Sequence, residues 1–232
     1  MLELQFDAVF DYKDLIVSGI LLTLGLSFGA IILGSILATL LTAFRSLGGK
    51  WAGVIVDTYV EIMRNTPFLV QLFMMFFGLA ALGFRIPGPE AALFAMTLNL
   101  AAYSTEILRA GVDSIQKPQL EAGMALAMTR RQVFQYVVLM PAIARVWPAL
   151  SSQFVLMLLA SSICSFISVQ ELSGVASIIE QRTFRSFESY IVVTLLYLAM
   201  ALSLKLFLLW LGKKLFPQVS GLARVDAHEE AA

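Results

Sequence analysis

The sequence contains little of what soluble enzymes and nucleic-acid-binding proteins rely on. It has one cysteine, Cys164, and one histidine, His228. An intramolecular disulfide is therefore excluded, and metal sites or catalysis based on Cys or His have no support. Only 14% of the residues are charged, and the 16 basic residues are balanced by 16 acidic ones. Because no basic excess is available to neutralise phosphates, nucleic acid is not an expected partner.

Hydrophobic residues make up 59% of the chain. A helix needs about 20 apolar residues to cross the ~30 Å hydrocarbon core of a bilayer. Five stretches are long enough, at about residues 15–44, 54–82, 91–108, 137–169 and 190–211. The acidic N-terminus lacks the basic region of a cleaved signal peptide. The sequence therefore predicts an all-α, multi-pass membrane protein with five transmembrane helices.

The distribution of Lys and Arg predicts the orientation, since cytoplasmic loops are enriched in basic residues. With the N-terminus outside, ten basic residues fall on the inner side and four on the outer side. An N-out, C-in chain then has an extracytoplasmic segment at residues 1–14, a single transmembrane domain at 15–216 and a polar cytoplasmic tail at 217–232.

The longest inner connection, at about residues 109–136, is predicted to contain two short helices. Pro118 suits the first turn of a helix, where no N–H donor is needed. Thr129 and Gln132 have the spacing of a capping box, which predicts a second helix starting at Arg130. From the residues alone, this loop is either an amphipathic surface segment or a platform on which another protein docks.

The second span is interrupted by polar residues, and Pro67 is expected to kink it. Glu61 and Arg64 lie three residues apart on one helix face, so an ion pair between them is expected. A similar anchor is expected between Glu106 and Arg109, near the inner end of the third span. Charges at membrane depth are costly, so these side chains are expected to face a cavity, a partner helix or the interface. Arg64 either stabilises the kink or takes part in a transport path.

The inner loop resembles the EAA loop of ABC-importer permeases. The resemblance rests on residues 121–123, on Ala127 and on residues 139–141, although Gly123 replaces the third motif residue and Ala127 replaces the usual glycine. In that family the loop's short helix docks on the ATP-binding subunit. The resemblance therefore implies an ATPase-coupling surface made of Glu121, Ala122, Gly123, Ala125 and Ala127.

Three further segments, at residues 64–72, 102–111 and 169–172, resemble the polar-amino-acid permeases of the histidine, glutamine and glutamate type. Asn65, Ala160 and Gly212 depart from that pattern. The resemblance implies the type I importer architecture in a bacterial cytoplasmic (inner) membrane, with a cytoplasmic coupling helix. It also implies three kinds of partner: two ABC ATPase subunits, a second permease that is identical or homologous, and an extracytoplasmic amino-acid-binding protein.

The predicted function is that of a permease subunit moving polar amino acids, driven by ATP hydrolysis in a separate subunit. The chain has no P-loop, so ATP and Mg²⁺ are assigned to the partner ATPases, and no cofactor, metal or catalytic residue is expected in this chain. A zwitterionic substrate needs a cation or a helix N-terminus for its carboxylate, and a carboxylate or carbonyl groups for its ammonium; a kinked helix offers freed backbone groups for this. The predicted substrate-pathway residues are Glu61, Arg64, Thr66 and Gln71.

Two other classes of protein have less support in the sequence. An autonomous ion-coupled secondary carrier or channel for small polar solutes is the main alternative, but the sequence shows no inverted repeat to support it. An intramembrane enzyme would need a nucleophile or an acid–base pair, which the scattered carboxylates do not supply. The sequence leaves open which amino acid is moved and whether the two permeases are identical.

Overall fold

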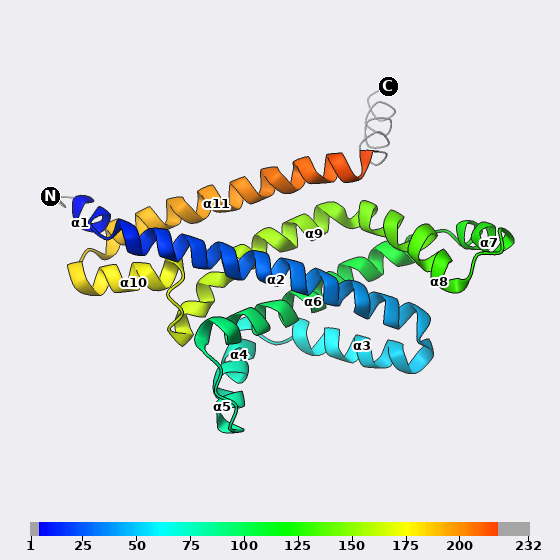
Figure 1. Ribbon diagram of the computed structural model, residues 1–232, viewed down its shortest axis with the longest axis horizontal. Coiled ribbons are helices and arrows are strands. Elements are labelled where there is room, and N and C mark those ends of the chain that lie inside the picture. Colours follow the sequence, from blue (N-terminus) through cyan, green and yellow to red (C-terminus); the bar gives the residue numbers. More distant parts are fainter. Residues whose placement is uncertain (1–4, 218–232) are drawn as a thin grey trace.

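The computed structural model describes residues 5–217, and these are helical with no strand among them (Figure 1). Residues 1–4 and 218–232, which include His228 and nearly all of the predicted tail, lie outside the described part. The α-helices are α1 (Asp7–Phe10), α2 (Lys13–Leu47), α3 (Gly49–Arg64), α4 (Phe68–Phe73), α5 (Leu79–Ala81), α6 (Gly88–Asp113), α7 (Lys117–Ala125), α8 (Arg130–Gln132), α9 (Met140–Ala160), α10 (Leu172–Thr183) and α11 (Ser186–Leu215).

Four helices in the described part are long and apolar enough to cross a membrane. They are α2, α6, the continuous segment Arg130–Ile167 that contains α9, and α11. The fifth predicted span is the pair formed by α3 and the segment Phe68–Ala81, which are bent by 106° at their break. The predicted kink at Pro67 is therefore a complete interruption, because Pro67 adopts an extended conformation (φ −62°, ψ 138°) instead of a helical one.

Small residues allow α2 and α6 to pack closely at the centre of the bundle. Ala30, Ala38 and Ala101 are fully buried there. A Cβ atom on Gly34 would lie 3.1 Å from the Leu100 side chain, so this position has little room for a larger residue. In a bilayer, where lipid is as apolar as leucine, close approach through small residues is a main source of helix association.

The connection between α9 and α11 contains α10, a helix that the hydropathy pattern did not predict. Its N-cap is Glu171, a fully buried carboxylate that accepts a hydrogen bond from the Gly174 N–H at 2.8 Å. The Thr23 hydroxyl of α2 donates to the same carboxylate at 3.4 Å, and the Tyr197 hydroxyl of α11 donates to it as well. Burial raises the pKa of the Glu171 carboxyl, while these hydrogen bonds oppose that shift. One side chain thus joins α2, α10 and α11.

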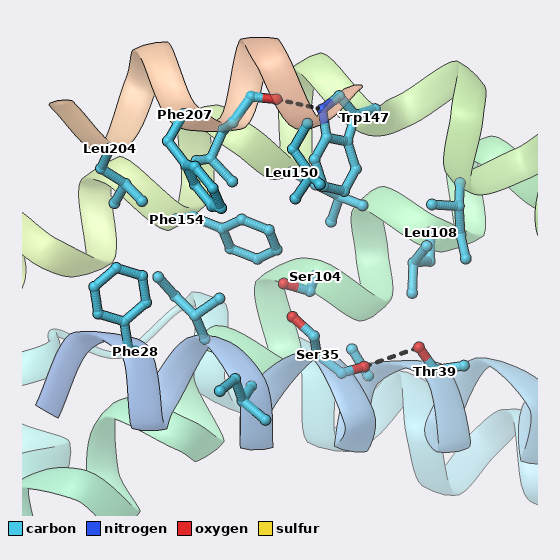
Figure 2. A pocket seen from close by; sticks show the side chains of 16 residues that line it. Phe28, Ser35, Thr39, Ser104, Leu108, Trp147, Leu150, Phe154, Leu204 and Phe207 are labelled. Carbon is cyan, nitrogen blue, oxygen red and sulfur yellow. Dashed lines mark hydrogen bonds between the residues drawn. The ribbon is translucent and has the colours of Figure 1, made fainter. Parts of the chain in front are cut away.

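The C-terminal helix α11 is held to α9 by Trp147 (Figure 2). The indole Nε1 donates to the Leu208 carbonyl oxygen at 3.1 Å. Beneath the ring lies an apolar cavity of about 370 Å³, lined by side chains of α2, α6, α9 and α11. A Cβ atom on Gly212 would lie only 2.3 Å from Nε1. The sequence departure at Gly212 therefore has a structural consequence, since it provides the space that Trp147 occupies.

Replacing Gly212 with alanine is expected to destabilise the protein by about 1–3 kcal/mol, because the added methyl group displaces Trp147 from the Leu208 carbonyl. Thermal unfolding in mild detergent can be followed by the reaction of a thiol probe with Cys164, which is buried in the folded chain. Gly25→Ala is the matched control, because nothing lies within 4 Å of its added Cβ. Equal unfolding temperatures for the two variants would contradict the packing role of Gly212.

Candidate functional site

The break between α3 and α4 is stabilised by polar side chains that bind the backbone carbonyls left without helical partners. The Thr66 hydroxyl donates to the Ile62 carbonyl oxygen at 2.8 Å. The Gln71 amide donates to the carbonyl oxygen of Met63 at 2.7 Å, spanning the break. Irregular backbone at membrane depth requires such internal partners. The polar residues around Pro67 therefore have a structural role, whatever else they contact.

A polar cavity of about 470 Å³ lies beside this break, between α3, α6 and α9. Of the predicted substrate-pathway residues, Arg64 and Thr66 line the cavity, whereas Glu61 and Gln71 do not. The lining residues are Arg64, Asn65, Thr66, Pro67, Phe68, Asn99, Tyr103, Gln153, Leu156, Met157 and Ala160.

Arg64 pairs with a different carboxylate from the one expected. Its Nη1 lies 3.5 Å from an oxygen of Glu106 on α6, and its guanidinium carbon lies 5.8 Å from the centre of the Tyr103 ring. Glu61 instead accepts a hydrogen bond from the Asn65 amide at 2.7 Å, so the predicted Glu61–Arg64 pair is wrong. The reason is that Arg64 ends α3, where its side chain reaches across to α6. The predicted anchor between Glu106 and Arg109 is confirmed, with a 2.8 Å contact from Arg109 Nε.

Four polar residues of the cavity, Asn65, Asn99, Tyr103 and Gln153, were not among the predicted substrate-pathway residues. Asn99 and Tyr103 lie four residues apart on α6, and Gln153 lies on α9. Asn99 is buried and donates to the Gln71 side-chain oxygen at 2.9 Å, so it also ties α6 to the broken span. An amide in an apolar span, one helical turn before a tyrosine, is the sequence signal that could have identified this pair.

The cavity lining combines one cation with neutral hydrogen-bonding groups. Arg64 is its one charged side chain, and the carboxylate of Glu106 lies beyond it as a counter-ion. Amide and hydroxyl groups from α3, α6 and α9 supply the remaining polarity. Within residues 5–217, no group of three or more His, Cys, Asp or Glu side chains is placed to hold a metal. The arrangement is suited to binding an anionic group, such as a carboxylate, on a small polar solute.

The inner loop contains the separate helix α7, whereas α8 is the first turn of the continuous segment Arg130–Ile167; both lie at the end of the molecule opposite the N-terminus (Figure 1). Pro118 lies in the first turn of α7, as predicted. The capping box is also confirmed, because the Thr129 side chain accepts from the Gln132 N–H and the Gln132 side chain accepts from the Thr129 N–H. Both features are local, which is why the sequence was sufficient to predict them.

The predicted coupling residues in and just after α7 differ in their exposure to solvent. Glu121, Ala122, Ala125 and Ala127 are exposed, whereas Gly123 is buried, and a Cβ atom there would lie 3.2 Å from a methyl group of Val133. Gly123 therefore allows α7 to pack closely against Val133, at the start of the segment Arg130–Ile167. The exposed surface also includes Met124 and Leu126, which are 56% and 78% exposed. These two large apolar side chains were not among the predicted coupling residues.

Ala127 has a backbone conformation that usually belongs to glycine. Its φ of 57° lies in the left-handed region, which costs about 1–2 kcal/mol for a residue with a Cβ atom. This is the position at which the EAA resemblance expects glycine. The sharp turn between α7 and α8 therefore forms despite the substitution.

A bundle of four membrane-crossing helices and a broken helix pair, with a polar cavity at the break and the exposed helix α7 at one end, is typical of a membrane transport protein. The comparison with known families then specifies which kind. The chain belongs to the family of inner-membrane components of binding-protein-dependent transport systems, whose profile matches residues 30–217. It is therefore an integral, multi-pass protein of the inner membrane.

Individual relatives agree with this family membership. A probable glutamine ABC transporter permease of Bacillus subtilis is 34% identical over 188 residues, covering 81% of this chain and 85% of that protein. The glutamine transport system permease of Escherichia coli is 32% identical over 216 residues, covering 91% and 99%.

A crystal structure of an amino acid ABC transporter with histidines matches with a TM-score of 0.83 and 33% identity, over 92% of this chain and 100% of that one. The predicted type I importer fold is confirmed. These likenesses favour an ABC permease over an autonomous carrier or channel.

Proposed function

We propose that this permease moves polar amino acids into the cell and that Arg64 binds the substrate carboxylate. The observation that carries the proposal is the cavity at the broken span, where Arg64 is accompanied only by neutral polar and apolar groups. A charge-assisted hydrogen bond from a guanidinium fixes a carboxylate more strongly than neutral donors do. The relatives named for glutamine and the amino acid ABC transporter support this substrate class.

The orientation and partners proposed for the chain are those that the sequence predicts. The N-terminus lies outside, and α7 lies inside with the C-terminal end of α11, which is at the same end of the molecule (Figure 1). Two ATPase subunits bind ATP and Mg²⁺ and dock on the α7 surface, a second permease completes the path, and an extracytoplasmic protein delivers the amino acid. This chain contributes no catalytic group to ATP hydrolysis.

In this mechanism the transporter alternates between states that differ in their affinity for the substrate. Movement of the ATPases displaces α7, and the displacement reaches the spans through the packed segment Arg130–Ile167. Arg64 then exchanges the substrate carboxylate for Glu106, whose oxygen already lies 3.5 Å away. Direction arises because ATP binding favours one state and substrate delivery the other.

Replacing Arg64 with alanine is expected to raise the KM for ATP-dependent glutamine uptake by about tenfold or more, because one charge-assisted hydrogen bond contributes about 1.5–3 kcal/mol. Uptake is measured with the complete transporter reconstituted into vesicles with its ATPase and binding protein. The kcat is expected to fall less than KM rises, since Arg64 contacts the substrate and not the ATPase.

Arg45→Ala is the matched control, because Arg45 pairs with Asp57 at 2.7 Å and does not line the cavity. It removes the same charge and is expected to leave KM unchanged. An unaltered KM in a well-expressed Arg64→Ala protein would remove Arg64 from the substrate site. Absence of ATP-dependent uptake of any amino acid by the wild-type complex would overturn the substrate class itself.

A further inference from the structure

Another groove, which shares only Leu156 with the lining of the polar cavity, lies between α9 and the C-terminal half of α11. Its volume is about 550 Å³, and most of its lining is apolar, including Trp147, Val155 and Leu209. Two lysines of α11, Lys205 and Lys213, also line it. The Ser151 hydroxyl faces the same groove and is buried without a hydrogen-bond partner in the described part of the chain.

The two lysines lie along one face of α11, eight residues apart, which corresponds to about 12 Å along the helix axis. Both are exposed, and no acidic side chain within residues 5–217 forms an ion pair with either of them. The neighbouring Lys214 differs, because its ammonium lies 5.2 Å from the centre of the Trp210 ring. The groove therefore presents two positive charges whose counter-ion is not supplied by any residue between 5 and 217.

The positions of the two lysines along α11 indicate which kind of ligand would fit the groove. Lys213 lies in the last turn of α11, and Lys205 lies more than two helical turns further inside the same span. A lysine at that depth is costly unless it meets a counter-charge or reaches the interface. A molecule that combines an apolar body with an anionic head would satisfy the lysines, the apolar walls and the Ser151 hydroxyl together.

We propose that this groove binds an anionic phospholipid of the inner leaflet. One acyl chain lies along Trp147, Val155 and Leu209, and the phosphate lies between Lys205 and Lys213. The proposal rests on the orientation proposed above but not on the identity of the transported substrate. Basic pockets between transmembrane helices on the cytoplasmic side are the usual means by which proteins select anionic headgroups.

The test titrates the assembled transporter in mild detergent with phosphatidylglycerol or phosphatidylcholine and counts bound lipid by native mass spectrometry. The wild type is expected to bind phosphatidylglycerol more tightly. Lys205→Gln should weaken that binding about fivefold and the Lys205→Gln/Lys213→Gln double variant about 25-fold, because each basic residue near an anionic surface contributes about 1 kcal/mol. Binding of phosphatidylcholine should change little.

Lys50→Gln is the matched control, since Lys50 is an exposed lysine at the start of α3 that does not line the groove. It removes the same charge and should leave lipid binding unchanged. Ser152→Trp, which fills the groove without altering charge, should reduce the binding of both lipids.

Two results would overturn the proposal. One is equal retention of phosphatidylglycerol by Lys205→Gln and Lys50→Gln. The other is a disulfide-linked dimer formed by Leu209→Cys, which would show that a second copy of the permease occupies the groove. The buried Cys164 does not complicate that cross-link. Because no readout depends on transport, failure here is distinct from failure of the proposed substrate.

Discussion

Replacing Leu126 with arginine is expected to abolish ATP-driven transport while leaving the transmembrane bundle folded. Leu126 is 78% exposed at the end of α7, on the surface proposed to dock on the ATPase. Removing a large apolar side chain such as leucine from water contributes about 1.5–3 kcal/mol, so burial of Leu126 is expected to favour docking. An unpaired charge buried in the interface would weaken association by about 3 kcal/mol or more, which exceeds a hundredfold.

The measurement is co-purification of the ATPase subunit with the permease in mild detergent. Leu82→Arg is the control, because Leu82 is 74% exposed and follows α5, away from α7 (Figure 1). The ATPase should be lost with the Leu126 variant and retained with the Leu82 variant. If Leu126→Arg still retained the ATPase, the docking surface would not include Leu126. A wild-type chain that transports without any ATPase would overturn the ABC mechanism.

Replacing Glu171 with leucine is expected to destabilise the protein by about 3–5 kcal/mol. The carboxylate is fully buried and accepts hydrogen bonds from Thr23, Gly174 and Tyr197. Leucine leaves those donors unsatisfied, and each unsatisfied buried group costs about 1–3 kcal/mol. Unfolding in detergent, followed by the exposure of Cys164 to a thiol probe, should shift to clearly lower temperature.

The same measurement on Glu171→Gln separates the hydrogen bonds from side-chain volume. Glutamine keeps an oxygen that can accept from the Gly174 N–H and an amide that can donate to the Tyr197 hydroxyl, so a smaller loss is expected. Glu90→Leu, at an exposed position in the first turn of α6, controls for the loss of a carboxylate. If Glu171→Leu and Glu171→Gln unfolded at the same temperature, the hydrogen bonds between α2, α10 and α11 would contribute little to the stability of the protein.

Sequence alone was sufficient for features that depend on a few neighbouring residues. The four spanning helices and the broken helix pair follow from the length of the apolar stretches, because a bilayer has a fixed thickness. The start of α7 at Pro118 and the capping box of Thr129 and Gln132 follow from local hydrogen bonding. The sequence also predicted the break around Pro67, because proline has no backbone N–H to donate a hydrogen bond within a helix.

The tertiary structure decided everything that depends on which helices meet. Arg64 was matched with Glu61 by spacing along one helix, yet the break at Pro67 lets α6 supply Glu106 instead. Gly123 is likewise buried because Val133 packs against this face of α7, and the two residues are brought together only by the fold.

The role of Glu171 could not be predicted from the sequence for the same reason. Its hydrogen-bond partners Thr23 and Tyr197 are 148 and 26 residues away in the chain. Local preferences fix helices and caps, whereas partners distant in sequence are fixed only when the helices pack. For this permease, the sequence by itself determined the apolar spans and the local structure of the inner loop, and only packing determined the walls of its cavities.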